Sequence, residues 1–375
     1  MKIGIVINTS WNVYNFRSGL IQSFIKSNHE VVAIAPEDGY AEKLKDLGCK
    51  FVGVEVDSKG SNPFNDLGLI WKLYTIYRRE KLDVVLHYTI KPNIYGSIAA
   101  KMLGIPSINN VTGLGTVFIR HNLTSKIAHH LYRWAFNFPE TVFFQNEDDR
   151  KLFVERKLVR PEIADVLPGS GIDLSRFLPT EFKKNATFTF LVISRVLYDK
   201  GILEYIDAIR LLRAQGIRAK FQLLGKIETE RGLGVPREQI NAWVKEGLIE
   251  YLGTVSDVIP VIQLADCVIL PSYREGTPRT LLEAASLGKP IIATDVPGCR
   301  DTVEHGFNGF LCKVKDPQDL ADKMKQIMHV GDTTLRQMGT NSRQLAVERF
   351  DQNIVIGKYQ RALYSLIGAP ELAAA

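Results

Sequence analysis

The chain lacks the features that mark disulfide scaffolds, zinc sites and membrane-spanning proteins. Its 375 residues include only four cysteines, none in a Cys-x-x-Cys pair and none near paired histidines. Neither a disulfide framework nor a structural zinc site is therefore expected. No apolar run approaches the roughly 20 residues that a transmembrane helix needs. The first ten residues turn polar too soon for a secretory signal peptide. These absences predict a protein of a reducing cytoplasm.

The common nucleotide-binding loops are missing as well. No Gly-x-Gly-x-x-Gly follows the first apolar run, where the segment from Asn8 to Arg17 stands instead, and the chain has no Walker loop. A Gly-x-Gly does occur at Gly113 and Gly115, but such a pair more often serves a tight turn. The first half also has no Asp-x-Asp motif after a strand, so no metal requirement is expected.

Composition is that of an ordinary globular protein long enough for two domains. Hydrophobic residues make up 45% and charged residues 23% of the chain. The net charge is +6, which suits anionic small ligands or an anionic membrane surface. This excess is not concentrated enough to indicate nucleic-acid binding.

Short apolar runs alternate with helical patterns along the whole chain, which predicts an α/β protein with parallel, doubly wound sheets. The segment from Gly169 to Thr187 has no clear period and is expected to link two series of strands. The first series is expected at residues 2–7, 30–35, 51–54, 84–87, 107–110, 141–145 and 164–167. The second is expected at residues 187–193, 220–224, 249–252, 267–270, 290–293 and 309–312.

The most informative segment runs from Glu275 to Glu283, directly after one of these strands. Thr277 suits the N-cap of a helix, and Pro278 suits its first position. Gly288 is expected to end that helix. The helix N-terminus would then project from the carboxyl edge of the sheet, where its N–H groups and dipole favour a phosphate.

The two glutamates bracket this helix start. Glu283 would lie about 1.5 turns inside, so the carboxylates would be on the order of 10 Å apart along the axis. That spacing suits a ligand with a hydroxylated ring at each end and a diphosphate between them, as in a nucleotide sugar. Alternatively, Glu283 is an exposed helix residue and Glu275 only favours the helix N-terminus. The apolar neighbours of Glu283 favour a buried carboxylate, which needs partners such as ribose hydroxyls.

Two basic residues, Arg195 and Lys200, follow the strand at 187–193. In an open α/β sheet, ligands bind at this edge. A guanidinium and an ammonium there can hold a diphosphate and stabilise it as a leaving group. The alternative is that both residues are solvated charges in a loop. The helix start expected on a neighbouring strand favours the diphosphate-binding role.

Two further candidates lie in the first half. His87 ends a strand at the ligand-binding edge, although a purely structural histidine is the alternative. The basic and aromatic segment from Arg120 to Phe138 suits a helix lying in a membrane interface. Its alternative is a surface helix whose aromatic side packs on the core.

These motifs together resemble the donor half of retaining glycosyltransferases of family 4. The similarity lies in Arg195-x4-Lys200-Gly201, Gly253, Glu275-x7-Glu283 and the segment from Gly298 to Gly309. The first half resembles a subgroup of that family through Phe16-Arg17, residues 91–96 and residues 111–115. That subgroup includes bacterial enzymes that extend undecaprenyl-diphosphate-linked oligosaccharides, among them N-acetylgalactosaminyltransferases.

The resemblance implies a GT-B fold, with two Rossmann-like domains facing across a cleft and a last helix that crosses back to the first domain. The acceptor-side domain is expected at residues 1–175 with the helix at 353–368, and the donor-side domain at 187–352. The resemblance also implies a nucleotide-sugar donor, retained configuration, and neither metal nor other cofactor.

The resemblance carries over roles for particular residues. Arg195, Lys200 and Glu275 would be catalytic, the first two holding the diphosphate and the third a donor-sugar hydroxyl. Glu283 would bind the ribose. The other donor-binding candidates are Gly276, Thr277, Pro278, Arg279, Thr280, Thr254 and Val255. Candidates for the acceptor or cleft are Asn15, Arg17, His87, Lys91, Thr112, Gly113 and Gly115.

Two departures from the family stand in the first half. Many relatives have a Gly-Gly loop after the first strand, where this chain has Trp11 to Asn15, and many have a histidine where Thr112 stands. The leading hypothesis is a cytoplasmic enzyme, peripheral on the inner face of the plasma membrane. It would move GalNAc or GlcNAc from a UDP-sugar to a polyprenyl-diphosphate-linked saccharide. The alternatives are a UDP-HexNAc 2-epimerase of the same fold and a non-catalytic nucleotide-sugar binding protein.

Overall fold

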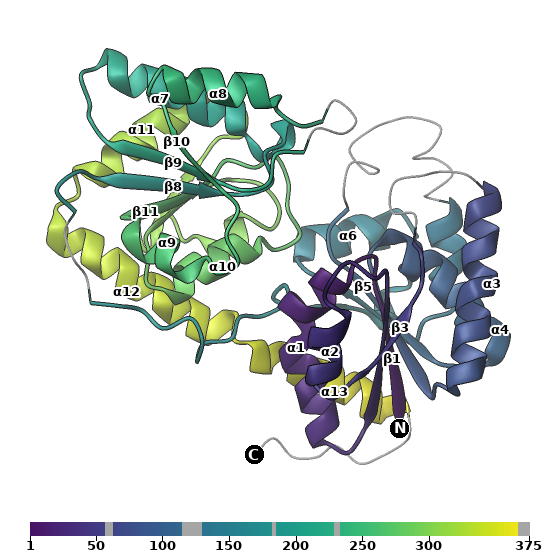
Figure 1. Ribbon diagram of the computed structural model, residues 1–375. Coiled ribbons are helices and arrows are strands. Elements are labelled where there is room, and N and C mark those ends of the chain that lie inside the picture. The colour runs from purple at the N-terminus through teal and green to yellow at the C-terminus, as the bar shows by residue number, and fades with distance from the viewer. Residues whose placement is uncertain (57–62, 115–129, 182–184, 229–232, 367–375) are drawn as a thin grey trace. The chain divides into compact units, whose positions relative to one another are not determined.

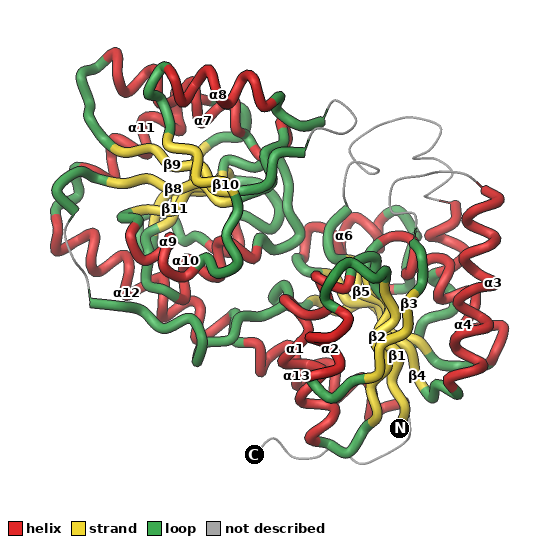
Figure 2. Tube along the Cα trace, viewed as in Figure 1, coloured by secondary structure: helices red, strands yellow, loops and turns green. Residues whose placement is uncertain are grey.

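In the computed structural model the chain folds into two α/β units (Figure 1). Unit 1 comprises residues 1–170 and 352–375, and unit 2 comprises residues 171–351. The structure describes residues 1–56, 63–114, 130–181, 185–228 and 233–366. Each unit has a parallel sheet with helices on both faces (Figure 2), which confirms the predicted doubly wound architecture.

Unit 1 is built on a seven-stranded parallel sheet of order β3-β2-β1-β4-β5-β6-β7. Every strand of the first predicted series is present, and each end falls within one residue of its expected place. Short, nearly continuous apolar runs explain this success, because a strand buried on both faces has little room for polar residues. The strands are β1 (Lys2–Val6), β2 (Glu30–Ala35), β3 (Lys50–Gly53), β4 (Val84–Tyr88), β5 (Ser107–Val111), β6 (Thr141–Phe144) and β7 (Ala164–Val166).

Two sets of helices cover the faces of this sheet (Figure 1). One face packs against α1 (Ser10–Lys26), α2 (Ala41–Asp46) and α13 (Gln352–Leu366), which supply Phe24, Leu44 and Leu363 to one core cluster. The other face packs against α3 (Pro63–Glu80), α4 (Ser97–Leu103) and α6 (Glu147–Glu155). A π-helix, η1 (Pro92–Gly96), precedes α4, and a 3₁₀ turn, η3 (Pro161–Ile163), precedes β7.

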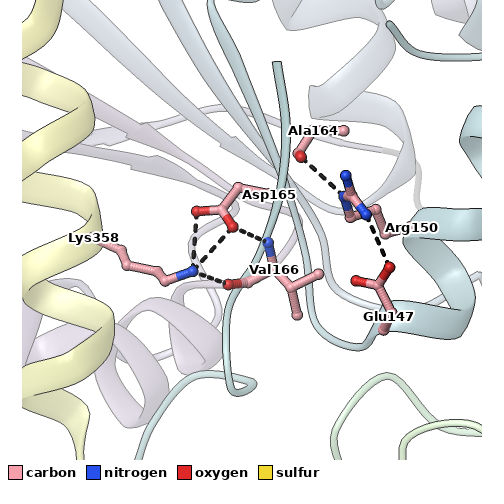
Figure 3. Close-up of polar contacts among 6 residues, drawn as sticks. All are labelled: Glu147, Arg150, Ala164, Asp165, Val166 and Lys358. Carbon is pink, nitrogen blue, oxygen red and sulfur yellow. Dashed lines mark hydrogen bonds and ion pairs between the residues drawn. The ribbon is translucent and has the colours of Figure 1, made fainter. Parts of the chain in front are cut away.

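The last helix returns to unit 1, as the sequence predicts. Tyr359 of α13 is buried and accepts a hydrogen bond of 2.8 Å from the Asn110 side chain in β5. Lys358 binds the Asp165 carboxylate at 3.0 Å and the Val166 carbonyl at 2.6 Å (Figure 3). On the other side of β7, Arg150 donates to the Ala164 carbonyl at 3.0 Å. Side chains from α13 and α6 therefore hold this edge strand from two directions.

Unit 2 is built on a six-stranded parallel sheet of order β10-β9-β8-β11-β12-β13. All six strands of the second predicted series are present, each within two residues of its expected ends. They are β8 (Thr189–Ile193), β9 (Lys220–Leu224), β10 (Glu250–Gly253), β11 (Cys267–Leu270), β12 (Ile291–Thr294) and β13 (Gly309–Cys312).

Helices cover both faces of the second sheet as well (Figure 2). One core cluster contains side chains of α7 (Ile202–Ala214), α8 (Arg237–Lys245) and α11 (Pro317–Met328). The opposite cluster contains side chains of α9 (Ile259–Leu264) and α10 (Arg279–Ser286). The long helix α12 (Asp332–Arg349) contributes to both, and the 3₁₀ turns η4 (Tyr198–Lys200) and η6 (Arg300–Thr302) follow β8 and β12.

The strand order reverses once in each sheet, between β1 and β4 in unit 1 and between β8 and β11 in unit 2. At such a switch point the connections from neighbouring strands run to opposite faces, which leaves a crevice at the carboxyl ends of the strands. The loops after β1 and β4, and those after β8 and β11, are therefore where each unit is expected to bind its ligand.

His87 of β4 is not at that surface, because it is completely buried inside the sheet. Its Nδ1 lies 2.9 Å from the Asn109 side-chain oxygen, and its Nε2 lies 3.0 Å from the Tyr77 hydroxyl. A Cβ added at Gly96 would come within 2.4 Å of the imidazole. Burial lowers the pKa of His87 to about 4, which keeps the ring neutral. His87 is therefore a buried structural histidine, which was the alternative to a ligand-binding role.

The buried imidazole predicts an acid-sensitive stability. The folded-state pKa of about 4 lies below the ordinary value of 6.5, so between these values the unfolded chain binds more protons. The free energy of unfolding should not depend on His87 above pH 6.5, and should fall on acidification towards pH 4 by at most about 1.4 kcal/mol per pH unit. Thermal melts from pH 7.5 to 4.5 should show a shallower pH dependence for His87→Gln than for wild type. The exposed His130→Gln should keep the wild-type slope, and a wild-type slope in His87→Gln would contradict the assignment.

Candidate functional site

Three loops of unit 2 meet at its switch point, following β8, β11 and β12. The Tyr273 amide of the second loop donates to the Asp199 carbonyl of the first at 2.9 Å. The Glu275 amide donates to the Pro297 carbonyl of the third at 3.2 Å. These backbone bonds join segments far apart in sequence into one surface at the carboxyl edge of the sheet.

Two glycines allow the loops to approach this closely. Gly201 has φ +71°, and a Cβ there would lie 2.0 Å from the Pro271 carbonyl oxygen. Gly298 has φ +79°, and a Cβ there would lie 2.1 Å from the Gly276 carbonyl oxygen. Both positions need a residue that adopts the left-handed region and has no side chain.

The approach brings Lys200 and Glu275 together. The Lys200 ammonium lies 2.5 Å from Oε1 of Glu275, and the two side chains are only 13% and 17% exposed. Sequence reasoning placed both at this edge but did not pair them. The structure combines a sheltered cation and a sheltered carboxylate at one point of the switch-point crevice.

Arg195 lies in the same loop but is placed differently. Its side chain is exposed, and it forms no ion pair with any residue that the structure describes. A guanidinium in this position can bind an incoming anion bidentately without first breaking an internal pair. The loop after β8 thus carries one fixed and one available positive charge.

Ser272 is a residue of this site that sequence reasoning missed. It is completely buried, and its hydroxyl lies 2.7 Å from the same Glu275 oxygen that Lys200 contacts. Its carbonyl accepts a hydrogen bond from the Thr294 hydroxyl of β12. The only sequence signal was its place, two residues beyond the end of β11. Ser272 therefore fixes the Glu275 carboxylate to the frame of the sheet.

The helix after Glu275 starts later than predicted. Helix α10 begins at Arg279 and Pro278 is its N-cap, so the assignments of Thr277 as N-cap and of Pro278 as first helical residue were wrong. The reason is the extended backbone of Pro278, with ψ 111°, which cannot continue into the helix. The end of the helix is as expected, because Gly288 follows the C-cap in the left-handed region with φ +70°.

Glu283 lies on a sheltered side of α10, with its side chain 14% exposed. Burial raises the pKa of the Glu283 carboxyl, and the Arg279 guanidinium opposes the rise. Arg279 Nε lies 3.2 Å from Oε1 of Glu283, one helical turn away. An exposed Glu283 is thus excluded. Thr254 and Val255 are exposed just after the edge strand β10.

A cavity of about 320 Å³ in unit 2 belongs to a different edge. It is lined by residues such as Asp266, Lys289 and Arg336. Asp266 directly precedes β11 and Lys289 lies just before β12, so the cavity is at the amino ends of the strands. It is separate from the Lys200–Glu275 site.

The unit 1 candidates are more scattered. Lys91 forms an ion pair of 2.7 Å with Asp66, Asn15 donates to the Trp11 carbonyl at 2.9 Å, and Arg17 is buried. Thr112 is half-buried just after β5 and Gly113 has φ +130°. The remaining candidate, Gly115, lies outside the described residues.

The basic aromatic segment is described only from residue 130 onward. There Tyr132 and Phe136 are buried in the core of unit 1, whereas Trp134 is 53% exposed. Arg133 is exposed and its guanidinium lies 3.3 Å from the Arg156 and Lys157 carbonyl oxygens. The aromatic residues of this part are thus divided between the core and the surface.

The described residues include neither a metal-binding cluster nor a membrane-spanning helix. No group of three or more His, Cys, Asp or Glu side chains is placed to hold a metal ion. Within the same ranges, no helix is long and apolar enough to cross a membrane.

Comparison with protein families gives a match for each half of the chain. The family described as Glycosyl transferases group 1 matches residues 177–345. The family described as Glycosyl transferase 4-like matches residues 2–146. The two matches correspond to the two observed sheets.

Two curated relatives match over most of the chain. One is N,N'-diacetylbacillosaminyl-diphospho-undecaprenol alpha-1,3-N-acetylgalactosaminyltransferase of Campylobacter jejuni, 30% identical over 96% of this chain and 97% of the relative. Another is UDP-Gal:alpha-D-GlcNAc-diphosphoundecaprenol alpha-1,3-galactosyltransferase of Escherichia coli. It is 26% identical over 86% of this chain and 85% of its own length.

Solved structures match the whole fold. Sucrose-phosphate synthase from Thermosynechococcus elongatus superimposes with a TM-score of 0.82 at 16% identity, covering 99% of this chain and 100% of that one. HepE of Anabaena in complex with UDP-glucose gives a TM-score of 0.80 at 20% identity, covering 98% and 100%. These similarities confirm the GT-B fold that the sequence predicts.

The close packing at Gly201 predicts that adding a methyl group there lowers the free energy of unfolding strongly. Gly201→Ala should destabilise unit 2 by more than about 2 kcal/mol, because it adds a clash with Pro271 to the cost of a left-handed alanine. Gly216→Ala is a matched control, since Gly216 has a similar φ of +75° and no atom within 4 Å of its Cβ position. Urea unfolding of both variants measures the difference. Equal losses would show that the loops do not constrain position 201.

Proposed function

This chain belongs to the glycosyltransferases that pair a group 1 domain with a family 4-like domain, and we propose that it transfers an N-acetylhexosamine from a UDP-sugar to a lipid-linked saccharide. The observation that carries the proposal is the sheltered Lys200–Glu275 pair at the switch point of unit 2, with the exposed Arg195 in the same loop as Lys200. The names of the Campylobacter jejuni and Escherichia coli relatives support a diphospho-undecaprenol acceptor. The UDP-glucose bound by HepE supports a UDP-sugar donor.

The charges at this edge suit departure of a nucleoside diphosphate. Arg195 and Lys200 hold the donor diphosphate and stabilise the negative charge that grows on it as the bond from the sugar C1 breaks. Glu275 stays beside Lys200 and accepts a hydrogen bond from a hydroxyl of the donor sugar. The acceptor hydroxyl forms the new C1–O bond on the face that the diphosphate leaves, and its proton passes to a phosphate oxygen. This course retains the configuration and uses no metal.

The rest of the donor lies along α10 and the rim of unit 2. The backbone from Gly276 to Thr280, at the entry to α10, contacts the sugar and the phosphates. Glu283 accepts from the ribose hydroxyls, since a buried carboxylate is stabilised by such donors. The base lies near Thr254 and Val255. Weaker UDP binding by Glu283→Ala in calorimetry is the expected sign of the ribose contact.

The acceptor is assigned to the carboxyl edge of unit 1, near Asn15, Arg17, Lys91, Thr112 and Gly113. Such an acceptor is anchored in lipid, so the enzyme works as a peripheral protein on the inner face of the plasma membrane. The net charge of +6 and the exposed Trp134 and Arg133 support this placement. Weaker sedimentation of Arg133→Glu with anionic vesicles would support the contact, and equal binding would count against it.

A donor screen tests the function directly. Wild type should release UDP from UDP-GalNAc or UDP-GlcNAc only slowly alone, and at least about 10-fold faster with a polyprenyl-diphosphate sugar, in the presence of EDTA. Lys200→Ala should lower kcat/KM at least about 100-fold, because it removes a charge-assisted contact to the leaving group. An epimerised UDP-sugar would indicate an epimerase, and tight UDP binding without turnover would indicate a binding protein. An absolute Mn²⁺ or Mg²⁺ requirement would overturn the metal-independent course.

Ser272 should act through the position of Glu275. Ser272→Ala removes the hydroxyl that holds the carboxylate, so kcat should fall about 10-fold while UDP affinity changes little, since the nucleotide does not contact this side chain. Ser272→Thr keeps the hydroxyl and should recover part of the loss. Single-turnover kinetics and UDP titrations separate the two effects. An equal loss of UDP affinity in Ser272→Ala would indicate a collapsed loop instead of a misplaced carboxylate.

A further inference from the structure

Unpaired buried polar atoms gather at the carboxyl edge of unit 1. Among the described residues, every such atom of this unit lies on α1, at the ends of β4 and β5, or in the π-helix after β4. They belong to Asn12, Arg17, Tyr88, Thr89, Asn93 and Asn110. Buried polar atoms in native proteins are normally hydrogen-bonded. A group of unpaired atoms at a switch point therefore marks a place that a ligand completes.

Arg17 is the unusual member of this group because it carries a charge. It is 4% exposed, its guanidinium lies 4.4 Å above the Tyr88 ring, and one of its nitrogens donates to the Phe16 carbonyl at 2.9 Å. Its Nε has no partner, and no carboxylate of the described residues pairs with it. Desolvating a cation without an anion is costly, so the arrangement favours an anion brought by a ligand.

Other anion-binding groups at this edge are already occupied. The start of α1 is closed by the Asp38 carboxylate, which accepts hydrogen bonds from the amides of Ser10 at 2.9 Å and Trp11 at 3.2 Å. Lys91 is paired with Asp66. A phosphate therefore cannot use the α1 N-terminus as it would in a glycine-rich loop. Within the described part of this edge, Arg17 is a buried cation that has no internal counter-ion.

The backbone next to Arg17 is strained in a way that is typical of binding sites. Thr89, which directly follows Tyr88, has φ +65° although it is β-branched. The π-helix η1 begins three residues later, and its Asn93 amide donates to the Thr89 carbonyl at 3.0 Å. Left-handed β-branched residues and π-helical turns both recur at functional sites.

The unpaired atoms form a mixed set that fits one class of ligand. The Arg17 guanidinium and the Thr89 hydroxyl can donate hydrogen bonds to phosphate oxygens. The side-chain oxygens of Asn93 and Asn110 can accept hydrogen bonds from sugar hydroxyls. Donors for an anion beside acceptors for hydroxyl groups describe a site for a phosphorylated sugar.

We propose that Arg17 binds the diphosphate of the sugar-diphosphate acceptor, and that the unpaired atoms around it complete the site. This rests on the proposed function for the identity of the ligand, whereas the anion site itself rests on the unit 1 geometry. The residues Tyr14, Asn15 and Phe16 that precede Arg17 are half-buried, whereas Arg17 itself is 4% exposed.

The test compares Arg17→Met with Lys26→Met, which removes an exposed charge from the same helix. Inorganic pyrophosphate is titrated calorimetrically into each protein saturated with UDP, so that the donor site is filled. We expect the affinity for pyrophosphate to fall at least 10-fold in Arg17→Met and to stay at the wild-type value in Lys26→Met. Arg17→Lys should lie between the two. The Tm of Arg17→Met should be unchanged or higher, because an uncompensated buried charge has been removed.

Kinetics identify the source of the anion. With a polyprenyl-diphosphate sugar as acceptor, Arg17→Met should raise KM at least 10-fold, whereas with an alkyl glycoside of the same sugar its KM should match wild type. A lower Tm in Arg17→Met with unchanged pyrophosphate affinity would make Arg17 a structural cation and overturn the proposal. If wild type transfers no sugar but binds pyrophosphate through Arg17, the proposed function fails and the anion site stands. Equal losses for both acceptors would overturn the diphosphate assignment.

Discussion

The ion pair between Lys200 and Glu275 is the constraint on which the rest of the unit 2 site depends. The two residues are 75 positions apart, and they meet because three loops share one carboxyl edge. The pair neutralises two charges that would otherwise be costly to shelter. It also fixes an ammonium where a diphosphate can lie and a carboxylate where a sugar hydroxyl can lie. Gly201, Gly298 and Ser272 all serve this one contact, the first two by leaving room and the third by holding the carboxylate.

The two switch points are completed in opposite ways. In unit 2 the sheltered Lys200 and Glu275 are paired with each other, so neither charge is left uncompensated before a ligand arrives. In unit 1 the buried Arg17 has no described counter-ion, and unpaired polar atoms lie at the same edge of the sheet. The same topology therefore gives one edge that is organised in advance and one edge that a ligand would complete. This difference suits a donor site whose charged groups are held in place before binding, and an acceptor site whose buried cation recognises the charge of its ligand.

Most of the fold could be predicted from the sequence because its strands and helices follow from short local patterns of apolar and polar residues. Strands buried on both faces appear as short apolar runs such as Cys267–Leu270, and parallel strands direct their loops to one edge. Arg195, Lys200 and Glu275 could be placed at that edge for the same reason. Their pairing could not, since it depends on how closely two loops pack across the sheet. Ser272 was missed because a single serine after a strand has no distinctive local pattern.

The errors have physical causes of the same kind. The start of α10 was misplaced because the extended ψ of Pro278 is set by the loop and not by the preference of proline for a first helical turn. His87 lies near the carboxyl end of β4, as the sequence predicts, but its side chain points inward to Tyr77 and Asn109. The alternation of a strand predicts two faces, and in a sheet covered on both sides neither face reaches solvent.

The return of α13 to unit 1 has a consequence for how the protein is made. Val355, Tyr359 and Leu363 of this helix fill one core of unit 1, and Lys358 holds the edge strand β7. At about 5–20 residues per second, a ribosome reaches this helix roughly 10–40 s after it has finished β7. All of unit 2 is translated in that interval. The domain that begins the chain is thus the last to be completed, and until then its sheet exposes apolar surface that nascent-chain chaperones can bind.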